Sequence, residues 1–311
     1  MNEESSKVAI LIPCRNEEIS IEKVVSGFRK VLPDVAIYIG DNNSTDRTAS
    51  LARELDCEVI FEYNPGKGHM LRHLIRDVEA DYYVIVDGDD TYDPGAVVSM
   101  LELIKRYDLD MVISRRVTSE KDKQNERSGH LLGNRTINIF FNILFNSTYR
   151  DVLSGYRVLS SNFAKSFPSK SNGFEIEVEL NAHANWMNAS VMEFDSGYKS
   201  RVDGSESKLR TFHDGIRIIK EIYLLNRRSN PMRHFKIFYT PLIALALGLV
   251  LRAVVPYLDS GKVENLPSLL VGMSLLTLNS VLWSSFLVME QANSHQLSLV
   301  NLLRRKAFKC E

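Results

Sequence analysis

Two long apolar segments near the end of the chain limit its fold more than any other feature. Residues 237–258 contain one charged side chain, Arg252, and residues 266–289 contain none. About 20 consecutive apolar residues are enough to cross the hydrocarbon core of a bilayer. A buried core helix is the alternative for either segment alone. Two such segments in succession, joined by a short polar loop, favour a transmembrane hairpin.

Basic residues lie on both outer sides of this hairpin. The loop between the two segments has only Lys262 against Asp259 and Glu264. By the positive-inside rule, both ends of the hairpin face the cytosol and the loop faces outward. We therefore expect an integral protein of a bacterial or archaeal plasma membrane, with its main folded part and both termini in the cytosol. The flanking basic residues are Arg227, Arg228, Arg233 and Lys236 before the first segment and Arg304, Arg305, Lys306 and Lys309 after the second.

The formal net charge of −1 conceals two oppositely charged parts. The first 200 residues contain 23 basic and 31 acidic side chains, whereas the remaining 111 contain 15 and 8. A nucleic-acid-binding protein would carry its basic residues on the main folded surface, so we expect no nucleic-acid partner. The three cysteines are far apart and form neither a disulfide framework nor a zinc-ligand spacing.

Before the apolar segments, short β-branched runs alternate with longer helical stretches. This pattern is typical of an α/β domain with a largely parallel sheet. Each expected strand ends in a polar or glycine-containing cluster, and ligands bind at the carboxyl ends of strands in open α/β sheets. We expect strands at residues 8–12, 35–40, 58–62, 82–87 and 110–114, and helices near 17–31, 46–55, 68–79 and 94–106.

The most informative of these clusters is the string DGDDTYDP, which follows the fourth expected strand at residues 87–94. Crowded carboxylates repel one another unless a divalent cation sits between them and a phosphorylated ligand. The alternative is an acidic turn in which Asp93 caps the helix that begins near Pro94. Taken alone, the string does not decide between these two readings.

Three further strand ends carry groups suited to a nucleotide. Pro13, Arg15, Asn16 and Glu17 follow the first strand, and residues 41–46 (DNNSTD) follow the second, although Ser, Thr and Asp before a helix are also ordinary caps. After the third strand, Gly66-Lys67-Gly68 offers close backbone approach and a point charge for a diphosphate. It is not the phosphate loop of ATP- or GTP-hydrolysing enzymes.

In this order, the strings P-x-R-N-E-E, D-N-N-S-T-D, G-K-G and D-G-D-D-T-Y resemble family-2 glycosyltransferases. The closest resemblance is to the dolichol-phosphate and undecaprenyl-phosphate sugar synthases. It continues through GNR at 133–135, DVLSGYR at 151–157, GFEIEVE at 173–179 and YKSRVDGSESKL at 198–209, and so covers almost all of residues 7–230. Bacterial members also have a C-terminal hairpin.

The resemblance implies a Rossmann-like GT-A domain that binds a nucleotide sugar. We expect this domain over residues 1–204 and an amphipathic juxtamembrane segment over 205–234. The transmembrane hairpin would occupy 235–290, and a basic cytosolic tail would follow over 291–311. The resemblance also suggests a homo-oligomer, with tetramers as one form.

The resemblance assigns roles to individual residues. Asp87 and Asp89 would hold the donor diphosphate through Mg²⁺ or Mn²⁺. The expected catalytic residues are Asp87, Asp89, Asp151 and Arg157. Glu179 is expected to be structural rather than near the site. Donor-binding residues would be Pro13, Arg15, Glu17, Asp41, Asn42, Lys67, Asp87, Asp90 and Thr91. Because a lipid phosphate needs compensating positive charge, the basic acceptor-phosphate candidates are Arg115, Arg116, Arg135, Arg157, Arg201 and Lys208. The resembling strings add Ser154 and Glu175.

Two departures from the family pattern concern the donor. Asn42 stands where family members usually have a second aspartate, and D-G-D-D-T stands where mannosyl transferases commonly have D-A-D-L-Q. We therefore favour a UDP-sugar such as UDP-GlcNAc or UDP-glucose, with GDP-mannose left open. The predicted reaction is transfer of this sugar, with inversion, to a polyprenyl phosphate at the membrane.

Three alternatives remain open at this point. The acceptor could be a glycan or a protein, as in other family-2 enzymes. The domain could be a nucleotidyltransferase, which also pairs carboxylates with a metal, although the G-K-G and SGYR strings would then lack a reason. It could also be a non-catalytic membrane scaffold, against which the intact D-G-D string argues.

Overall fold

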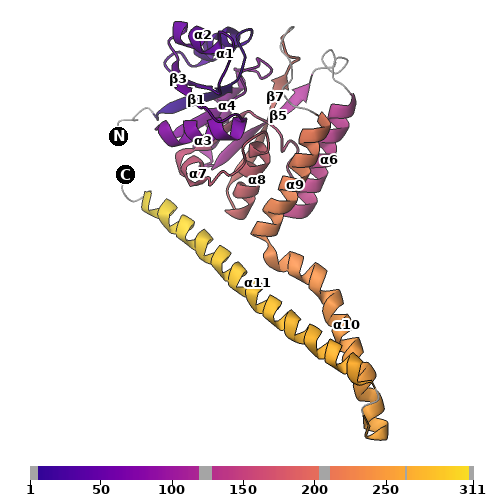
Figure 1. The fold of residues 1–311 in the computed structure, drawn as a ribbon. Coiled ribbons are helices and arrows are strands. Elements are labelled where there is room, and N and C mark those ends of the chain that lie inside the picture. Colours follow the sequence, from indigo (N-terminus) through magenta and orange to yellow (C-terminus); the bar gives the residue numbers. More distant parts are fainter. Residues whose placement is uncertain (1–5, 119–127, 203–210, 263–264, 308–311) are drawn as a thin grey trace. The chain divides into compact units, whose positions relative to one another are not determined.

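The structure is a computed structural model that describes residues 6–118, 128–202, 211–262 and 265–307 (Figure 1). The chain divides into two compact units, Met1–Tyr223 and Leu224–Glu311. The first unit contains the sheet and the strand-end motifs, and the second contains the two apolar helices. Each unit is described separately below.

The first unit is built on one seven-stranded sheet with the order β3-β2-β1-β4-β6-β5-β7. The pairs β1–β2, β1–β4, β2–β3 and β5–β7 are parallel, while β6 runs antiparallel to both of its neighbours. The expected largely parallel sheet is thus confirmed. The strands are β1 (Val8–Cys14), β2 (Ala36–Asp41), β3 (Glu58–Phe61), β4 (Tyr82–Ile85), β5 (Met111–Thr118), β6 (Arg157–Ser160) and β7 (Val191–Tyr198).

Strand β1 is central because it is apolar and pairs on both edges. Its residues from Ala9 to Ile12 are fully buried. Side chains alternate between the two faces of a strand. Ile10 and Ile12 accordingly share one core cluster with the apolar sides of two helices, while Leu11 belongs to the opposite face. A strand buried on both faces explains why the segment reads as a continuous apolar run.

Helices cover both faces of the sheet. Helix α1 (Ile21–Val31) and helix α4 (Ala96–Arg106) present apolar residues at helical spacing to the cluster around Ile10. Helix α3 (Lys67–Asp77) packs on the other face, where a Cβ on Gly40 would lie 2.6 Å from Met70. Among the described residues, the other helices of this unit are α2 (Thr48–Glu54), α6 (Ser128–Phe145), α7 (Ser161–Ser166), α8 (Ile176–Trp186) and most of α9 (Thr211–Ser229).

The five expected strands are present with different ends, and two further strands were not anticipated. β1 continues to Cys14 rather than 12 and β5 to Thr118 rather than 114, whereas β4 ends at Ile85 rather than at residue 87, so that Asp87 leaves the sheet. The short strand β6 and the strand β7 lie in the part of the chain where no strand was predicted. β6 escapes a pattern search because its four residues include a buried arginine, Arg157.

The parallel register aligns the carboxyl ends of three strands. Cys14 of β1 pairs with Asp41 of β2, which pairs with Phe61 of β3. The loops that follow these strands therefore start from the same edge of the sheet. This edge is where an open α/β sheet binds ligands.

The second unit is an antiparallel pair of long helices, α10 (Pro231–Ser260) and α11 (Leu266–Ala307). Ser268 donates a hydrogen bond of 3.1 Å to the carbonyl of Leu249, and the rings of Tyr239 and Phe286 lie 5.8 Å apart. Gly261 caps the end of α10, with a φ of 65° in the left-handed conformation that glycine adopts readily. Over Tyr239–Asp259 and Leu266–Leu299 the helices are long and apolar enough to cross a membrane, with 11% of the most apolar stretch of each buried.

Substituting Gly272 tests the close packing of α10 and α11. A Cβ at Gly272 would meet Val250 Cγ2 at 2.8 Å and the backbone oxygen of Ala246 at 3.0 Å. We expect Gly272→Val to destabilise the hairpin by about 1–3 kcal/mol, because a backbone atom cannot yield to the added side chain. The measurement is the thermal midpoint of the purified protein in detergent.

The matched control is Gly248→Val, since apart from its chain neighbours and the nearby backbone of its own helix no atom lies within 4 Å of a Cβ at that position. Both variants gain the same side chain in a helix, so only contact between the helices separates them. Equal thermal midpoints for the two variants would contradict this packing.

Candidate active site

The loops after β1 and β2 are tied to each other by hydrogen bonds. The backbone N–H of Asn16 donates to Ser44 Oγ at 3.0 Å, and the N–H of Thr45 donates to Asn16 Oδ1 at 2.8 Å. The N–H of Glu17 donates to Thr48 Oγ1 at 2.8 Å. The donor candidates Pro13, Arg15 and Glu17 all lie on this frame, where Arg15 is exposed and Glu17 is buried.

The Asn42 side chain fixes the loop that follows β3. Its side-chain amide donates to the carbonyl of Glu62 at 3.2 Å and to that of Asn64 at 2.7 Å, and its Oδ1 accepts from the N–H of Gly66 at 2.6 Å. An ionised aspartate has no N–H to donate, so it could not make the first two bonds. This clamp gives a structural reason for the amide at the position where the family pattern has an acid. Its neighbour Asp41 is also buried, and Asp41 Oδ1 accepts from the N–H of Ser44 at 3.1 Å.

The G-K-G segment is pressed against the loop before α8. Gly66 has a φ of 132°, and a Cβ at Gly68 would lie 2.2 Å from the backbone oxygen of Ser171. The N–H of Gly68 donates to the carbonyl of Asn172 at 3.1 Å. Only residues without a side chain allow this approach, and it fixes the start of α3, where Lys67 lies.

Lys67 joins three elements at the centre of the site. Its Nζ makes ion pairs with Asp87 Oδ1, after β4, and with Glu177 Oε1 on α8. The other oxygen, Glu177 Oε2, is buried and has no hydrogen-bond partner. The backbone of Gly155 lies close against the Asp87 carboxylate, since a Cβ at Gly155 would lie 2.3 Å from Asp87 Oδ2.

Burial and charge act in opposite directions within this cluster. Burial by itself would lower the pKa of Lys67, but the carboxylates of Asp87 and Glu177 outweigh it and raise that pKa above its ordinary value. Burial raises the pKa of Glu177, and the charge of Lys67 opposes that rise. With all three groups ionised, the cluster has one net negative charge, which a cation beside Asp87 would offset.

Asp89 and Asp90 are paired with basic residues from the end of β7. Arg201 Nη2 lies 2.7 Å from Asp89 Oδ2, and Lys199 Nζ lies 2.9 Å from Asp90 Oδ1. The other oxygen of Asp89 accepts from Thr91 Oγ1 at 2.7 Å. Burial and the neighbouring charge of Asp87 raise the pKa of Asp89, while Arg201 and Thr91 oppose the shift.

The acidic residues at this edge fit a divalent metal ion. Carboxylate oxygens are hard ligands, and Mg²⁺ is commonly held by one or two carboxylates together with substrate phosphates. Within the described part of the chain, no three His, Cys, Asp or Glu side chains form a metal site by themselves. The Asp87 side chain is still 29% exposed. Asp87 and Asp89 therefore suit an ion that a phosphorylated ligand helps to hold.

Asp93 also caps the following turn, since its Oδ1 accepts from the N–H of Gly95 at 2.9 Å.

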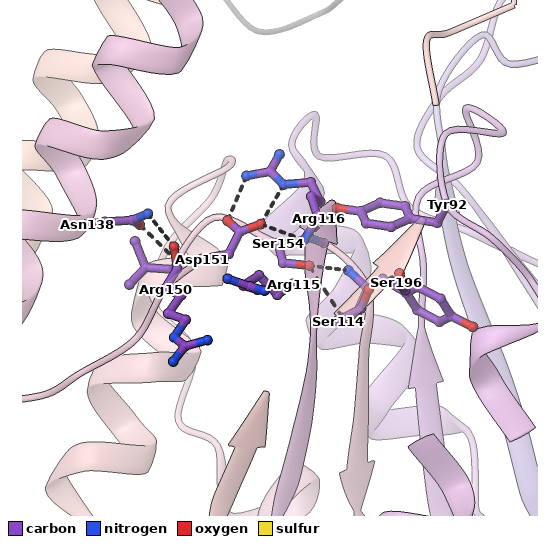
Figure 2. Close-up of polar contacts among 12 residues, drawn as sticks. Tyr92, Ser114, Arg115, Arg116, Asn138, Arg150, Asp151, Ser154 and Ser196 are labelled. Carbon is purple, nitrogen blue, oxygen red and sulfur yellow. Dashed lines mark hydrogen bonds and ion pairs between the residues drawn. The ribbon is translucent and has the colours of Figure 1, made fainter. Parts of the chain in front are cut away.

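A second charged cluster lies where β5 and β7 meet the loop before β6 (Figure 2). Arg116 grips Asp151 with two parallel hydrogen bonds of 2.7 Å, from Nε to Oδ2 and from Nη2 to Oδ1. Burial alone would lower the pKa of Arg116, but the Asp151 carboxylate raises it well above its ordinary value. Arg115 makes an ion pair with Asp195 on the neighbouring strand. In this structure the Asp151 carboxylate therefore holds an arginine in place.

The other acceptor candidates lie in different environments. Arg157 is 1% exposed, and its guanidinium donates to Asn181 Oδ1 at 2.7 Å and to three backbone carbonyls. Ser154 is fully buried, whereas Arg135 is exposed on α6. Glu175 makes an ion pair with Arg217 of α9, and Lys208 lies outside the described residues. Arg157 thus stabilises the loop before β6 through hydrogen bonds within the protein.

The three glutamates of GFEIEVE have three different partners. Glu175 contacts α9, whereas Glu177 contacts Lys67. Glu179 accepts backbone N–H bonds from Lys170 at 2.9 Å and from Ser171 at 3.0 Å. The sequence interpretation did not single out Glu177. The alternation of the three glutamates could not rank them, because residues 176–184 of α8 are all buried and each glutamate is at most 6% exposed.

Comparison with known proteins identifies the family. The model of glycosyl transferase family 2 matches residues 9–163. The chain is 31% identical over 246 residues to the glycosyltransferase AglJ of Haloferax volcanii, an alignment that covers 78% of this chain and 80% of that protein. The chain belongs to glycosyl transferase family 2. This family assignment favours a glycosyltransferase over the alternative that the domain is a nucleotidyltransferase.

Two further comparisons concern a relative and the fold. This glycosyltransferase is 24% identical over 265 residues to the UDP-N-acetylglucosamine--dolichyl-phosphate N-acetylglucosaminyltransferase of Methanococcus voltae, covering 78% of this chain and 98% of that protein. Glucosyl-3-phosphoglycerate synthase of Mycobacterium tuberculosis, in complex with Mn²⁺, UDP-glucose and phosphoglyceric acid, superposes with a TM-score of 0.56 at 17% identity, over 72% of this chain and 80% of that chain. The expected GT-A-like fold is confirmed.

Replacing Asn42 tests the clamp on the G-K-G loop. In Asn42→Asp the carbonyls of Glu62 and Asn64 would face a carboxylate instead of an amide donor. An unsatisfied buried group costs about 1–3 kcal/mol, so we expect kcat/KM for the nucleotide sugar to fall about tenfold or more. Asn43→Asp is the control, because it makes the same charge change at the exposed neighbouring residue. Equal losses in both variants would attribute the effect to charge alone and contradict the clamp.

Removing Lys67 tests the ion cluster. Lys67→Met leaves the carboxylates of Asp87 and Glu177 facing each other, and we expect a loss of stability of about 3–5 kcal/mol. Adding Glu177→Gln to Lys67→Met removes one of the two carboxylate charges and should recover part of the loss. Thermal midpoints of the single and double variants give the coupling, with the exposed Lys30→Met as control. Additive effects would contradict a shared cluster.

Proposed function

We propose that this family-2 glycosyltransferase moves a sugar from a UDP-sugar to a polyprenyl phosphate at the cytosolic surface of a membrane. The observation that carries the proposal is the pair of apolar helices α10 and α11. A helix in the core of a soluble protein is mostly buried, but only 11% of the most apolar stretch of each of these helices is buried. Such helices need an apolar surrounding, and a lipid acceptor supplies a reason for an enzyme to reside there.

The donor half of the proposal rests on the Lys67 cluster. A nucleotide sugar brings a diphosphate to the strand ends, where Lys67 and a divalent cation beside Asp87 would together outweigh the charges of Asp87 and Glu177. The frame of Pro13, Arg15, Glu17 and Asp41 would hold the base and ribose. Support for a UDP-sugar comes from the Methanococcus voltae relative, whose name includes UDP-N-acetylglucosamine, and from the mycobacterial structure with UDP-glucose.

Asp87 and Asp89 would hold Mg²⁺ or Mn²⁺ together with the donor diphosphate, and Asp90 and Thr91 would support them. When bound, such an ion neutralises the negative charge that grows on the departing nucleotide. By pairing with Lys67, Glu177 would keep the Lys67 ammonium close to the negative charge of the departing nucleotide. The buried Glu177 Oε2 marks a hydrogen-bond acceptor that the protein itself leaves unused.

The acceptor half of the proposal rests on the second charged cluster. A phosphate monoester is anionic near neutral pH, so it needs positioning and charge compensation more than a general base. Asp151 fixes the fork of Arg116, and an oriented guanidinium fits phosphate oxygens in pairs. Arg115 and Arg150 lie in the same region (Figure 2). A single displacement by the acceptor phosphate inverts the anomeric carbon.

The charge distribution supports the proposed membrane orientation. Basic residues flank the outer ends of both apolar segments, and anionic cytosolic lipids attract such clusters. Both termini and the catalytic unit would thus lie in the cytosol. A polyprenyl phosphate presents its phosphate in the same headgroup layer, which would place donor, acceptor and enzyme on one side of the membrane.

The proposal is tested by incubating membranes that contain the full-length enzyme with polyprenyl phosphate and a panel of labelled nucleotide sugars. We expect one UDP-sugar to label an organic-extractable lipid, and EDTA to abolish the labelling. Asp89→Asn should lower the rate at least about 100-fold, because charge stabilisation of the leaving group is lost. Asp34→Asn, at an exposed residue, should retain activity. Failure of every donor to label lipid, or full activity of Asp89→Asn, would contradict the proposal.

A further inference from the structure

The end of β7 forms a basic strap, defined here as residues 198–201, beside the acidic loop of residues 87–92. Tyr198 pairs with Tyr92 in an antiparallel bridge. The N–H of Lys199 donates to the carbonyl of Thr91 at 2.9 Å. The rings of Tyr92 and Tyr198 also pack edge to face, 5.2 Å apart. Backbone and ring contacts together fix the strap next to the aspartates.

The strap places one cation on each of two neighbouring carboxylates. Arg201 Nη2 lies 2.7 Å from Asp89 Oδ2, and Lys199 Nζ lies 2.9 Å from Asp90 Oδ1. The Asp89 side chain is 5% exposed, whereas that of Arg201 is 31% exposed. The arginine thus reaches from the surface to a carboxylate that is almost entirely buried.

Both oxygens of Asp89 are occupied in this arrangement. Oδ1 accepts from the Thr91 hydroxyl at 2.7 Å, and Oδ2 takes the guanidinium of Arg201. A divalent cation that used Asp89 would meet the positive charge of Arg201 at the same oxygen. In a site shielded from water, two cations at one carboxylate repel each other strongly. Metal binding and the Arg201 pair therefore compete.

We propose that Arg201 is an internal counter-cation of the donor site, which neutralises Asp89 until a metal–nucleotide complex displaces it. This inference rests on the proposed function, in that it takes Asp89 as the metal-binding carboxylate. The guanidinium lowers the affinity of the site for a free cation. The donor diphosphate offers the displaced guanidinium a new anionic partner, so nucleotide and metal bind cooperatively. Arg201 is a positioning residue in this role, acting through Asp89.

The arrangement has a physical advantage over an empty acidic pocket. A buried carboxylate without a partner is costly, and Arg201 supplies a partner for Asp89 Oδ2. Thr91 supplies one for the other oxygen by donating its hydroxyl hydrogen bond.

The test is a titration of the purified full-length enzyme with Mn²⁺, following the free ion by electron paramagnetic resonance with and without UDP. Without UDP, Arg201→Gln should bind Mn²⁺ about tenfold more tightly than the wild type, the size expected for one charge-assisted hydrogen bond. With UDP this difference should shrink or disappear. Arg201→Lys, which keeps the charge but loses the planar fork, should remain closer to the wild type.

Two controls separate the possible results. Arg106→Gln removes one positive charge at an exposed position of α4 and should leave Mn²⁺ affinity within about twofold of the wild type, because exposed charges are screened. Asp89→Asn should abolish binding. Unchanged or weaker binding in Arg201→Gln, with binding still lost in Asp89→Asn, would overturn the inference and leave the proposed function standing. Absence of Mn²⁺ binding in every variant would overturn both the inference and the metal role proposed for Asp89.

Discussion

The ion cluster of Lys67, Asp87 and Glu177 is the interaction on which the rest of the site depends. Its three members come from the start of α3, the loop after β4 and helix α8, so they hold three separate parts of the fold together. A charge buried this deeply is stable only with partners in good geometry. The glycines on either side of Lys67, the Asn42 clamp and the close approach of Gly155 all serve to maintain that geometry.

The same principle of compensated charge extends outward from the cluster. Asp89 is neutralised by Arg201 and Asp151 holds Arg116, so the carboxylates around the site are matched by cations that a phosphorylated ligand can recruit. An enzyme that brings two phosphorylated substrates together has to manage repulsion between them. The proposed reaction fits an arrangement in which fixed arginines and a metal ion take up that charge.

Much of the fold could be predicted from sequence because alternation of short apolar strands with amphipathic helices is a local signal. The strand-end strings located the site because parallel strands have their carboxyl ends on the same edge of the sheet. Local patterns do not indicate partners across the chain. Nothing near Glu177 shows that it meets Lys67, because residues 176–184 of α8 are all buried. Likewise, nothing near Arg201 shows that it pairs with Asp89. Arg157 looked like a ligand for phosphate by residue type, but its bonds are within the protein.

The most direct test of the central claim is the intact mass of the lipid product formed from polyprenyl phosphate and the active nucleotide sugar. Transfer of the sugar alone adds one glycosyl residue to the lipid monophosphate and releases a nucleoside diphosphate. We predict that product, with the anomeric configuration inverted. A lipid product that carries an additional phosphate, or a glycosylated product found only in the aqueous phase, would contradict the account.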